Sequence, residues 1–351
     1  MQVKPRSLFD RQPLRIVDRG GVPMWRIGGV EFPVIAGGAT DSVISRTDAA
    51  ALIPESVANE IIKGTTEESA ALTFFRRVTM PSKTTRMPVV TALPIAGFVS
   101  GDTGLKQTTE VNWDNKYLEA EEIAIIVPIP EAVLDDAAFD VWAEVRPLIE
   151  EAFARTLDAA IFFGTNKPAS WPTAIVPAAI AASNVQARGA NDAARGGVSG
   201  DIDALISLVE ADGYDVNGMI ANRTFRGELR KARDTTGQRL LDISANEIEG
   251  ARVMFPMSGM WPATGDQDAE LIAGDFTQGI VGVRQDITYR ILSEAVIQNG
   301  DGTIAYNLAQ QDMVALRAVA RYAFQVPNPI NRQNPNAGTR YPFAVLQSPN
   351  V

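Results

Sequence analysis

The chain has 351 residues, of which 46% are hydrophobic and 21% are charged, a composition typical of a folded globular protein. Its net charge of −10 argues against nonspecific nucleic-acid binding by the chain as a whole. The absence of cysteine and histidine excludes disulfides, thiolate nucleophiles, zinc sites with sulfur ligands and imidazole catalysis. This length favours two lobes over one. No apolar run approaches the ~20 residues of a membrane span, and no apolar core follows the basic start, so we expect no secretory signal.

Charge is unevenly distributed along the chain. Residues 1–26 contain six basic and two acidic residues, whereas residues 119–151 contain ten acidic residues and a single basic one, Arg146. A basic arm and an acidic midsection on one chain suit contact between copies of that chain. A mobile tail and a solvated helix face explain the same pattern, and both interpretations stay open.

The first fifty residues are rich in proline and in Gly-Gly pairs and lack helical periodicity. We expect an extended arm that is ordered only by lying along something else. A short helix follows, because Ile53, Val57 and Ile61 share one helical face and Gly64 is a stop signal. A second helical turn is expected at residues 67–72.

Two strand-like runs come next, at residues 74–93 and 108–130, joined by a glycine-rich loop. In the second run Val111 and Trp113, and later Ile123, alternate with polar or exposed positions, the period-two pattern of a strand. Each arm of about 15 residues would reach ~50 Å at ~3.3 Å per residue. A hairpin this long is unstable in isolation, so we expect it to contact another molecule.

The clearest helix is predicted at residues 135–164. An apolar stripe recurs at helical spacing, Asp135 or Asp136 can cap the start, and Gly164 can end it. Pro147 is expected to kink this helix or divide it in two, because its ring clashes with the preceding turn.

A glycine- and alanine-rich loop at residues 165–200 is interpreted as a domain crossing, followed by a mixed second lobe. The helices and strands expected after this loop are at residues 201–212 (helix), 218–222 (strand), 225–234 (helix), 251–257, 269–276, 279–292 and 294–299 (strands). The last strong element is predicted at residues 310–329, before a tail rich in proline and asparagine.

Two acidic motifs could carry chemistry. The triplet that begins at Asp102 matches the Asp-Thr-Gly of aspartic proteases, but no second copy exists in the chain and a turn beside glycine explains it equally well. Asp135, Asp136 and Asp140 could hold Mg²⁺. Acidic residues at a helix start need no such role, since they cap free amides, and we favour that interpretation.

Arginines recur along one predicted helix. Arg223, Arg226, Arg230 and Arg233 are spaced to form a single stripe. A solvated face is the default interpretation; contact with another subunit and binding of phosphate groups are the alternatives. The chain contains 25 arginines and 7 lysines, which favours multidentate pairing at interfaces. None of the common nucleotide-binding, serine-hydrolase or zinc-protease motifs is present.

Seven segments in this order resemble the major capsid proteins of tailed bacteriophages, which have the Hong Kong 97 fold. The segments are LIPESVANEIIKGTTEESAAL, FRRVTMPSKTTRMPV, EVNWDNKYLEAEEIAIIVPIPEAVLDD, the helix ending in TLDAAIFFGT, LRKARDTTGQRLL, LIAGDFTQGIVGVRQDITYRI and DMVALRAVARYAFQV. Together they span about residues 50–327. Each pattern alone is loose, and their common order makes the resemblance specific.

The resemblance implies an α+β chain with the Hong Kong 97-type capsid fold. Its parts would be an N-terminal arm, a short helical segment, an extended β-hairpin loop, a peripheral domain with a long spine helix, and an axial domain. The expected boundaries are 1–50 for the arm, 51–73 for the helical segment, 74–127 for the extended loop, 128–199 with 312–345 for the peripheral domain, and 200–311 for the axial domain.

The implied function is structural. Copies of the chain would form the pentamers and hexamers of an icosahedral shell that encloses double-stranded DNA without sequence-specific binding. We expect no enzyme activity, cofactor, metal or membrane contact. The chain would belong to the virion and assemble in the host cytoplasm, with a portal and a separate scaffold as partners. Decoration proteins are a further candidate class of partner. A separate scaffold is expected because no long charged coiled segment precedes the arm.

The residues expected at contacts between copies are positively charged or aromatic. They are Arg11, Arg15, Lys106, Trp113, Lys116, Arg223, Arg226 and Arg230. Arg11 and Arg15 are expected to meet the acidic midsection of another copy.

Some members of the family crosslink covalently, a loop lysine attacking an asparagine of a neighbour beside a glutamate base. Lys106 and Lys116 lie in the corresponding region, and Asn328, Asn331 and Asn334 lie late enough in the chain. No glutamate aligns clearly, so the crosslink is only an alternative.

Three other functions stay open. An encapsulin, the shell protein of a cellular compartment, has the same fold. A hydrolase based on carboxylates and a nucleic-acid-binding module are more distant alternatives, the latter opposed by the acidic composition.

Overall fold

The computed structural model describes residues 15–19, 22–27, 30–33, 69–99, 105–106, 108–137, 140–192, 196–232, 246–256, 259–262 and 269–349. The chain divides into two units, Met1–Ile61 and Ile62–Val351, each considered by itself here. The helix expected near Ile53 lies outside the described residues, as do Arg11, Asp102 and Arg233. The boundaries of the expected domains stay a prediction, although several strands pair with strands that were expected in a different domain.

The first unit contains a small antiparallel sheet. Strands β1 (Arg15–Arg19), β2 (Val22–Ile27) and β3 (Val30–Pro33) pair in chain order. We expected an arm without local structure. The sequence nonetheless has Gly-Gly between β1 and β2 and again between β2 and β3, and two-residue hairpin connections favour that pair.

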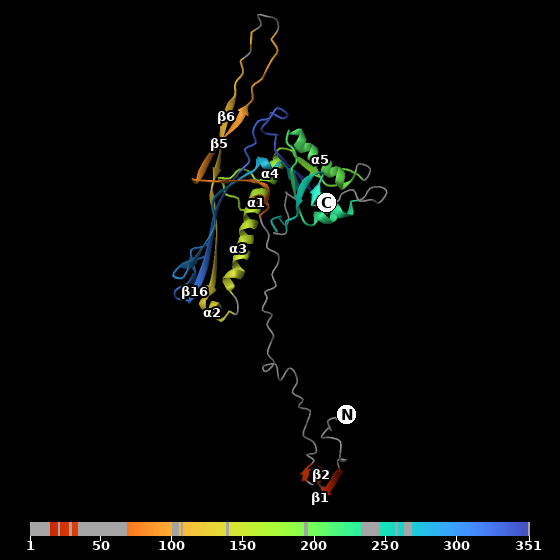
Figure 1. Cartoon of the computed structure of the whole chain (residues 1–351), viewed down its shortest axis with the longest axis vertical. Helices are drawn as coiled ribbons and strands as arrows, with labels where there is room; N and C mark the ends of the chain where they lie inside the picture. The colour runs from red at the N-terminus through yellow and green to blue at the C-terminus, as the bar shows by residue number, and fades with distance from the viewer. Residues whose placement is uncertain are drawn as a thin grey trace, which may run out of the picture. The chain divides into compact units, whose positions relative to one another are not determined.

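The second unit is built around a four-stranded sheet with the order β4-β13-β16-β7 (Figure 1). Its strands are β4 (Arg76–Thr79), β13 (Ile280–Leu292), β16 (Met313–Gln325) and β7 (Glu121–Pro130). β16 runs antiparallel to both neighbours, and β4 runs parallel to β13. Alternate residues of β7, including Ile123 and Ile125, pack into the main core, as their period-two spacing predicts.

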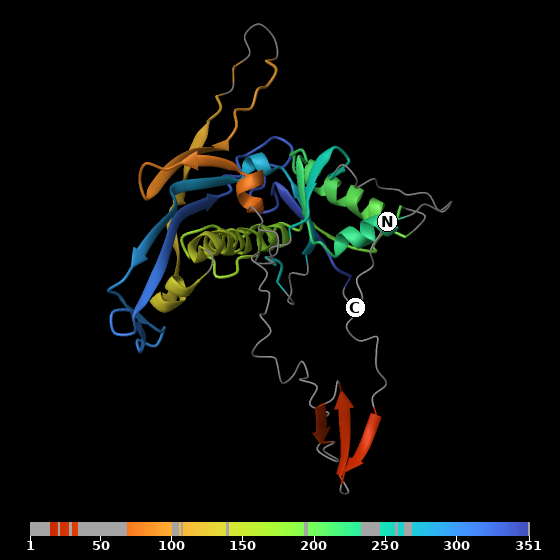
Figure 2. The ribbon, with the colours of Figure 1, turned by 60° about the horizontal axis from the view of Figure 1, so that its bottom comes forward.

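Helix α3 (Val141–Asp158) lies along one face of this sheet, with Ile149, Phe153 and Leu157 buried in the same core (Figure 2). Its N-cap is Asp140, whose carboxylate accepts hydrogen bonds from the amides of Trp142 and Ala143 at 3.0 and 3.2 Å.

The cap expected from Asp135 or Asp136 is therefore wrong, because both residues end a separate short helix, α2 (Glu131–Asp136). The expected division at Pro147 is also wrong, since α3 continues through it. Proline removes only one helical hydrogen bond there, and the buried face of α3 outweighs that loss. The helix passes into one π turn, η2 (Ala159–Phe163), and ends at Gly164, whose φ of 79° is left-handed.

A buried carboxylate joins α3 to the segment that leads into the sheet. Asp158 is 1% exposed and accepts hydrogen bonds from the Ser69 hydroxyl at 2.5 Å and from the amides of Ala70 and Ala71 at 2.8 and 3.0 Å. It thereby caps α1 (Ala70–Phe74), the helical turn expected at residues 67–72.

A six-stranded sheet with the order β10-β11-β9-β12-β17-β8 forms the second lobe. Its strands are β10 (Glu247–Ile248), β11 (Ala251–Met254), β9 (Gly218–Ala221), β12 (Ala269–Gly274), β17 (Phe343–Gln347) and β8 (Val185–Ala187). The helices of this lobe are α4 (Ile175–Ala181), α5 (Val198–Ala211) and α6 (Phe225–Lys231). A second hydrophobic core joins α5 and α6 to this sheet.

Several strands differ from the expected assignment. β4 and most of β7 were expected in the extended loop, but both pair within the four-stranded sheet. β13 was expected in the axial domain, but it pairs with β16 and β4 after the chain turns through the short helix η4 (Phe276–Gln278). β17 lies in the tail where no element was expected, between β12 and β8, in the six-stranded sheet and not beside β16.

Two hairpins project from the sheets. β14 (Val296–Gln298) pairs with β15 (Ile304–Asn307) near the end of β13. β5 (Thr84–Ala92) pairs with β6 (Asn112–Glu119) and extends away from the rest of the unit (Figure 1). The β5–β6 hairpin is shorter than expected. The strand of the second run is interrupted at Ala120, and the remainder of the run, β7, joins the four-stranded sheet.

Candidate assembly surface

The β5–β6 hairpin presents an uncovered aromatic face. Trp113 and Tyr117 lie on the same side of β6 and are 65% and 49% exposed. Their partners across the hairpin are Val90 and Arg86. A two-stranded ribbon cannot cover its own faces, and large apolar groups exposed together mark contact sites.

The tip of this hairpin is apolar as well. Ile95, Phe98 and Leu105 are 75%, 110% and 94% exposed, and Val99 is 44% exposed. These side chains lie in the loop between the paired strands, where they have no core to enter. Both the tip and the aromatic face of β6 belong to one hairpin and expose large apolar side chains, and together we call them the hairpin surface.

The root of the hairpin is fixed to the body. Leu118 is fully buried and Val89 is 7% exposed. The amide of Ile330 donates to the Val90 carbonyl at 3.2 Å, and the Gln325 side chain donates to the Tyr117 carbonyl at 3.0 Å. The base of the hairpin is thus anchored to the body, and the tip lies beyond these contacts.

The expected contact residues of the hairpin are exposed. Lys106 lies at the tip, and Lys116 lies on β6 on the side opposite Trp113, since successive strand residues point to opposite faces. Arg15 lies in β1, where the structure describes the backbone alone, and Arg11 lies outside the described residues. The structure therefore groups Trp113 with Tyr117 and separates it from Lys116.

The expected arginine stripe is wrong as a single helical face. α6 covers only Phe225–Lys231, so Arg223 precedes the helix. Arg226 is half-buried, with its guanidinium 5.0 Å from the centre of the Phe255 ring, and its Nε is buried without a hydrogen-bond partner. Arg230 is exposed in the last turn. Packing of Arg226 on an aromatic ring, and not solvation, fixes its position.

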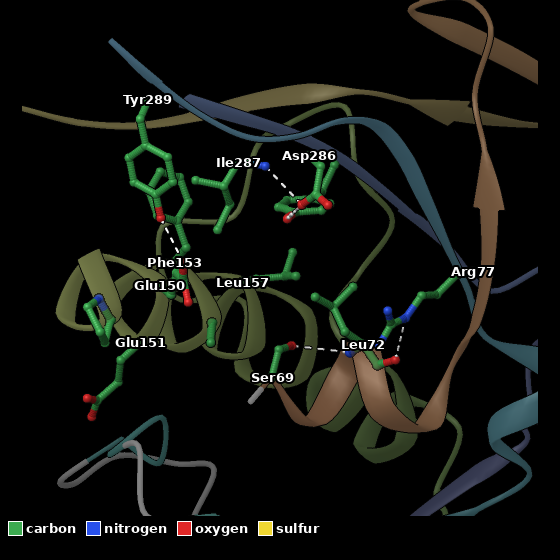
Figure 3. Close-up of a pocket in the computed structure, with 13 residues that line it drawn as sticks. Ser69, Leu72, Arg77, Glu150, Glu151, Phe153, Leu157, Asp286, Ile287 and Tyr289 are labelled. Carbon is green, nitrogen blue, oxygen red and sulfur yellow. Dashed lines mark hydrogen bonds between the residues drawn. The ribbon is translucent and has the colours of Figure 1, made fainter. Parts of the chain in front are cut away.

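A groove of about 640 Å³ lies between α3, α1 and the four-stranded sheet (Figure 3). In it the Tyr289 hydroxyl donates to Glu150 at 3.0 Å, and the Tyr322 hydroxyl donates to Asp286 at 3.5 Å. Burial, followed by these carboxylates, raises the pKa of both phenols to about 12. Both phenols are therefore neutral hydrogen-bond donors. Tyr289 of β13 links the sheet to α3, and Tyr322 of β16 bonds to the neighbouring strand β13.

The asparagines considered for a crosslink have intramolecular partners. The Asn328 side chain donates to the Arg340 carbonyl at 2.7 Å and accepts from the Tyr214 hydroxyl at 2.9 Å. The amide groups of Asn331 and Asn334 donate to Asp212, at 2.6 Å to its carbonyl and 2.7 Å to its carboxylate. An attacking lysine would have to displace these bonds.

The other chemical alternatives gain no support from the geometry. In the part of the chain that the structure describes, no group of three or more carboxylates is placed to hold a metal, and Asp140 acts as a helix cap. Asp102 lies outside that part. The described helices include none long and apolar enough to cross a membrane.

Sequence reasoning missed most of the hairpin surface. Ile95, Phe98 and Leu105 lie between the two predicted strands and were not predicted as contacts, although large apolar residues in a loop are themselves a signal of contact. Tyr117 could have been added from its two-residue spacing to Trp113.

Comparisons with known proteins agree with this architecture. The sequence model of the Phage capsid family matches residues 49–330. The major capsid protein of Staphylococcus phage 80alpha is 31% identical over 226 residues, which are 63% of this chain and 65% of that protein, so the match spans just under two thirds of that relative.

Two solved phage structures match most of the chain. One from Microbacterium phage Oxtober96 is 41% identical and has a TM-score of 0.76, covering 87% of this chain and 99% of that one. One from Mycobacterium phage Bobi is 33% identical with a TM-score of 0.77, covering 88% and 99%. These matches confirm the expected Hong Kong 97-type capsid fold and the expected class of phage capsid proteins, which is not an enzyme class. The chain belongs to the Phage capsid family.

Proposed function

We propose that this chain is the repeating subunit of a tailed-phage shell, in which copies form pentamers and hexamers around double-stranded DNA that they bind without sequence preference. The observation that carries the proposal is the hairpin surface, an apolar tip and an aromatic strand face on a hairpin anchored to the body. A monomer gains nothing from such a surface, whereas a shell in which each hairpin lies over a neighbouring copy covers it.

The tip alone supplies a substantial driving force. Burying one large apolar side chain contributes about 1.5–3 kcal/mol, so Ile95, Phe98 and Leu105 together contribute on the order of 5–9 kcal/mol per subunit before ordering costs. Each subunit of a closed shell makes several contacts of this kind, and their effects combine through avidity. No single interface needs to be tight.

The charged residues have subsidiary roles in this proposal. The basic arm, with Arg11 and Arg15, crosses a neighbour and meets its acidic midsection. Lys106 and Lys116 line the hairpin contact, and Arg223 and Arg230 are exposed for contacts of the second lobe. Assembly would take place in the host cytoplasm with a separate scaffold and a portal, and decoration proteins could follow.

The identity of 31% to a phage major capsid protein, and of 31–41% to chains in solved phage structures, supports a phage shell over a cellular compartment. The direct test is negative-stain electron microscopy of the purified chain with size-exclusion chromatography, alone and with the scaffold. We expect closed particles or rings of five and six. A monomer or dimer at every concentration and in both conditions would reject the proposal.

A further inference from the structure

Two arginines lie side by side on the four-stranded sheet. Arg290 of β13 and Arg317 of β16 are directly opposite in the antiparallel ladder, which puts their Cβ atoms ~4.5–5.5 Å apart. Ile126 of β7 completes the row. The residue before Arg290, Tyr289, points to Glu150 of α3, and successive side chains point to opposite faces. The row therefore lies on the face of the sheet away from α3.

Neither arginine has an ion-pair partner within the described part of the chain. Nε of Arg317 is buried and lacks a hydrogen bond. Glu122 is occupied by Arg321 at 2.7 Å. Glu122 and Asp286 are also each four residues from the row, or ~13 Å at ~3.3 Å per residue. Like charges directly opposite each other destabilise a sheet, so this pair weakens the isolated subunit.

The surroundings of the arginines favour a protein partner. Ile126 is 41% exposed, Ala124 is exposed, and the row that contains Ala124 also contains Val319 and Thr288, whose hydroxyl donates to the Val319 carbonyl at 3.2 Å. An apolar rim excludes water and strengthens ion pairs within it, as at the centre of a protein interface. A surface for nucleic-acid phosphates would instead be wet and broadly basic.

A matching pair of carboxylates lies on α2. Glu131 and Asp135 are four residues apart on this short helix, which brings their Cβ atoms to ~5–6 Å, close to the spacing of the two arginines. Both side chains are exposed. No described residue forms an ion pair with either carboxylate.

The two surfaces cannot meet within one chain. α2 begins directly after β7, and Glu131 is five residues beyond Ile126, or ~16 Å along the strand. Its amide is fixed to the Asp312 carbonyl at 2.9 Å, at the end of the sheet. The carboxylates must therefore come from another copy.

We propose that α2 of one copy docks on the Arg290–Arg317 face of another, with Glu131 and Asp135 paired to the two guanidinium groups. This inference rests on the proposed shell function and adds one defined contact to it. The surfaces differ, so each copy gives one and receives one, as closed rings and shells require. The contact relieves a repulsion present in the free subunit.

The first test measures two quantities that should change in opposite directions, the melting temperature of the subunit and the yield of particles. In the full-length chain, Arg290→Gln is expected to raise the melting temperature of the dissociated subunit and to lower the yield of assembled particles. The matched control on the same face, Arg321→Gln, is expected to lower the subunit melting temperature, because it breaks the pair with Glu122. An Arg290→Gln chain that assembles as well as wild type would overturn the inference.

The second test is a charge exchange read by electron microscopy. Arg290→Glu with Arg317→Glu, and separately Glu131→Arg with Asp135→Arg, are expected to block assembly of folded subunits, and the four changes together to restore it. Failure of the four-change chain, with its subunit folded, would refute the pairing. So would a loss confined to the arginine variant, which would indicate another acidic partner or nucleic acid. Failure of the wild-type chain to assemble would instead count against the proposed function.

Discussion

Replacing Asp158 by alanine is the sharpest test of how the body of the subunit is held together. Its carboxylate is 1% exposed and accepts three hydrogen bonds, from the Ser69 hydroxyl and from the amides of Ala70 and Ala71. The substitution leaves these donors in a buried site without their acceptor. It also removes a negative charge from the start of α1.

Each buried donor left without a partner costs about 1–3 kcal/mol, so we expect Asp158→Ala to lower the free energy of unfolding by about 3–5 kcal/mol. For a unit of this size that corresponds to a fall of about 10 °C in melting temperature. The matched control is Asp140→Ala, which removes an exposed cap with two amide bonds and should cost about 0.5–2 kcal/mol.

The assay is thermal unfolding of the dissociated subunit, followed by circular dichroism. A fall for Asp158→Ala no larger than that for Asp140→Ala would refute the reasoning, because burial and the third hydrogen bond would then have no measurable effect. Asp158→Asn keeps one acceptor oxygen, so its fall in melting temperature should lie between those of Asp140→Ala and Asp158→Ala.

Three further outcomes are expected. Phe98→Ser should leave the subunit melting temperature within about 1 °C while reducing particle yield in electron microscopy, because the side chain is fully exposed in the monomer; unchanged yield would contradict the role of the tip. Burial and Glu150 raise the pKa of the Tyr289 phenol to about 12, so the fold favours its neutral form. Its contribution to folding stability is therefore complete below pH 10 and is lost as pH rises from 10 through 12. Tyr289→Phe should make the fall of melting temperature across that window less steep, and an equally steep fall would count against the hydrogen bond. Arg11→Glu with Arg15→Glu should impair assembly, and normal shells from that double variant, counted in micrographs, would exclude the pairing of the arm with the acidic midsection.

Local periodicity predicted several elements well. The apolar stripe of α3, including Ile149 and Phe153, predicts a helix whose buried face is observed. The alternation around Ile123 predicts a strand with one buried side, and β7 has one. In both cases one chain segment carries the whole signal, so no knowledge of its partner is needed.

Pairing between distant strands was beyond the reach of periodicity. β7 and β16 pair across almost two hundred residues, and alternation says which face is buried but not which strand lies alongside. β13 was assigned to the same lobe as β12 because β13 follows β12 in the sequence. The chain changes sheets at η4, where Asp275 caps the turn and Gly279 packs so closely on Phe75 that a side chain would not fit.

β17 was missed for a different reason. Its buried run is short and lies in a tail rich in proline and asparagine, where local propensity argues against a strand. Tertiary contacts decide instead: Asp212 accepts hydrogen bonds from the Tyr341 amide and the Asn184 side chain, which brings the tail beside β8.

Alternation placed Trp113 on the apolar side of a strand, but its side chain is 65% exposed because a two-stranded ribbon has no core to cover it. Its contact with another copy stays a prediction. The opposition of Arg290 and Arg317 depends on strand register, which is altered by irregularities near Gln285, so no single-strand pattern could reveal it.

The most direct test of the central claim is a cryo-electron microscopy map of particles assembled from the purified chain. We expect a closed shell in which the hairpin of each copy lies on a neighbour, with density from that neighbour covering Phe98 and Trp113. Particles whose hairpins project into solvent, or a chain that forms no shell with its scaffold present, would contradict the account.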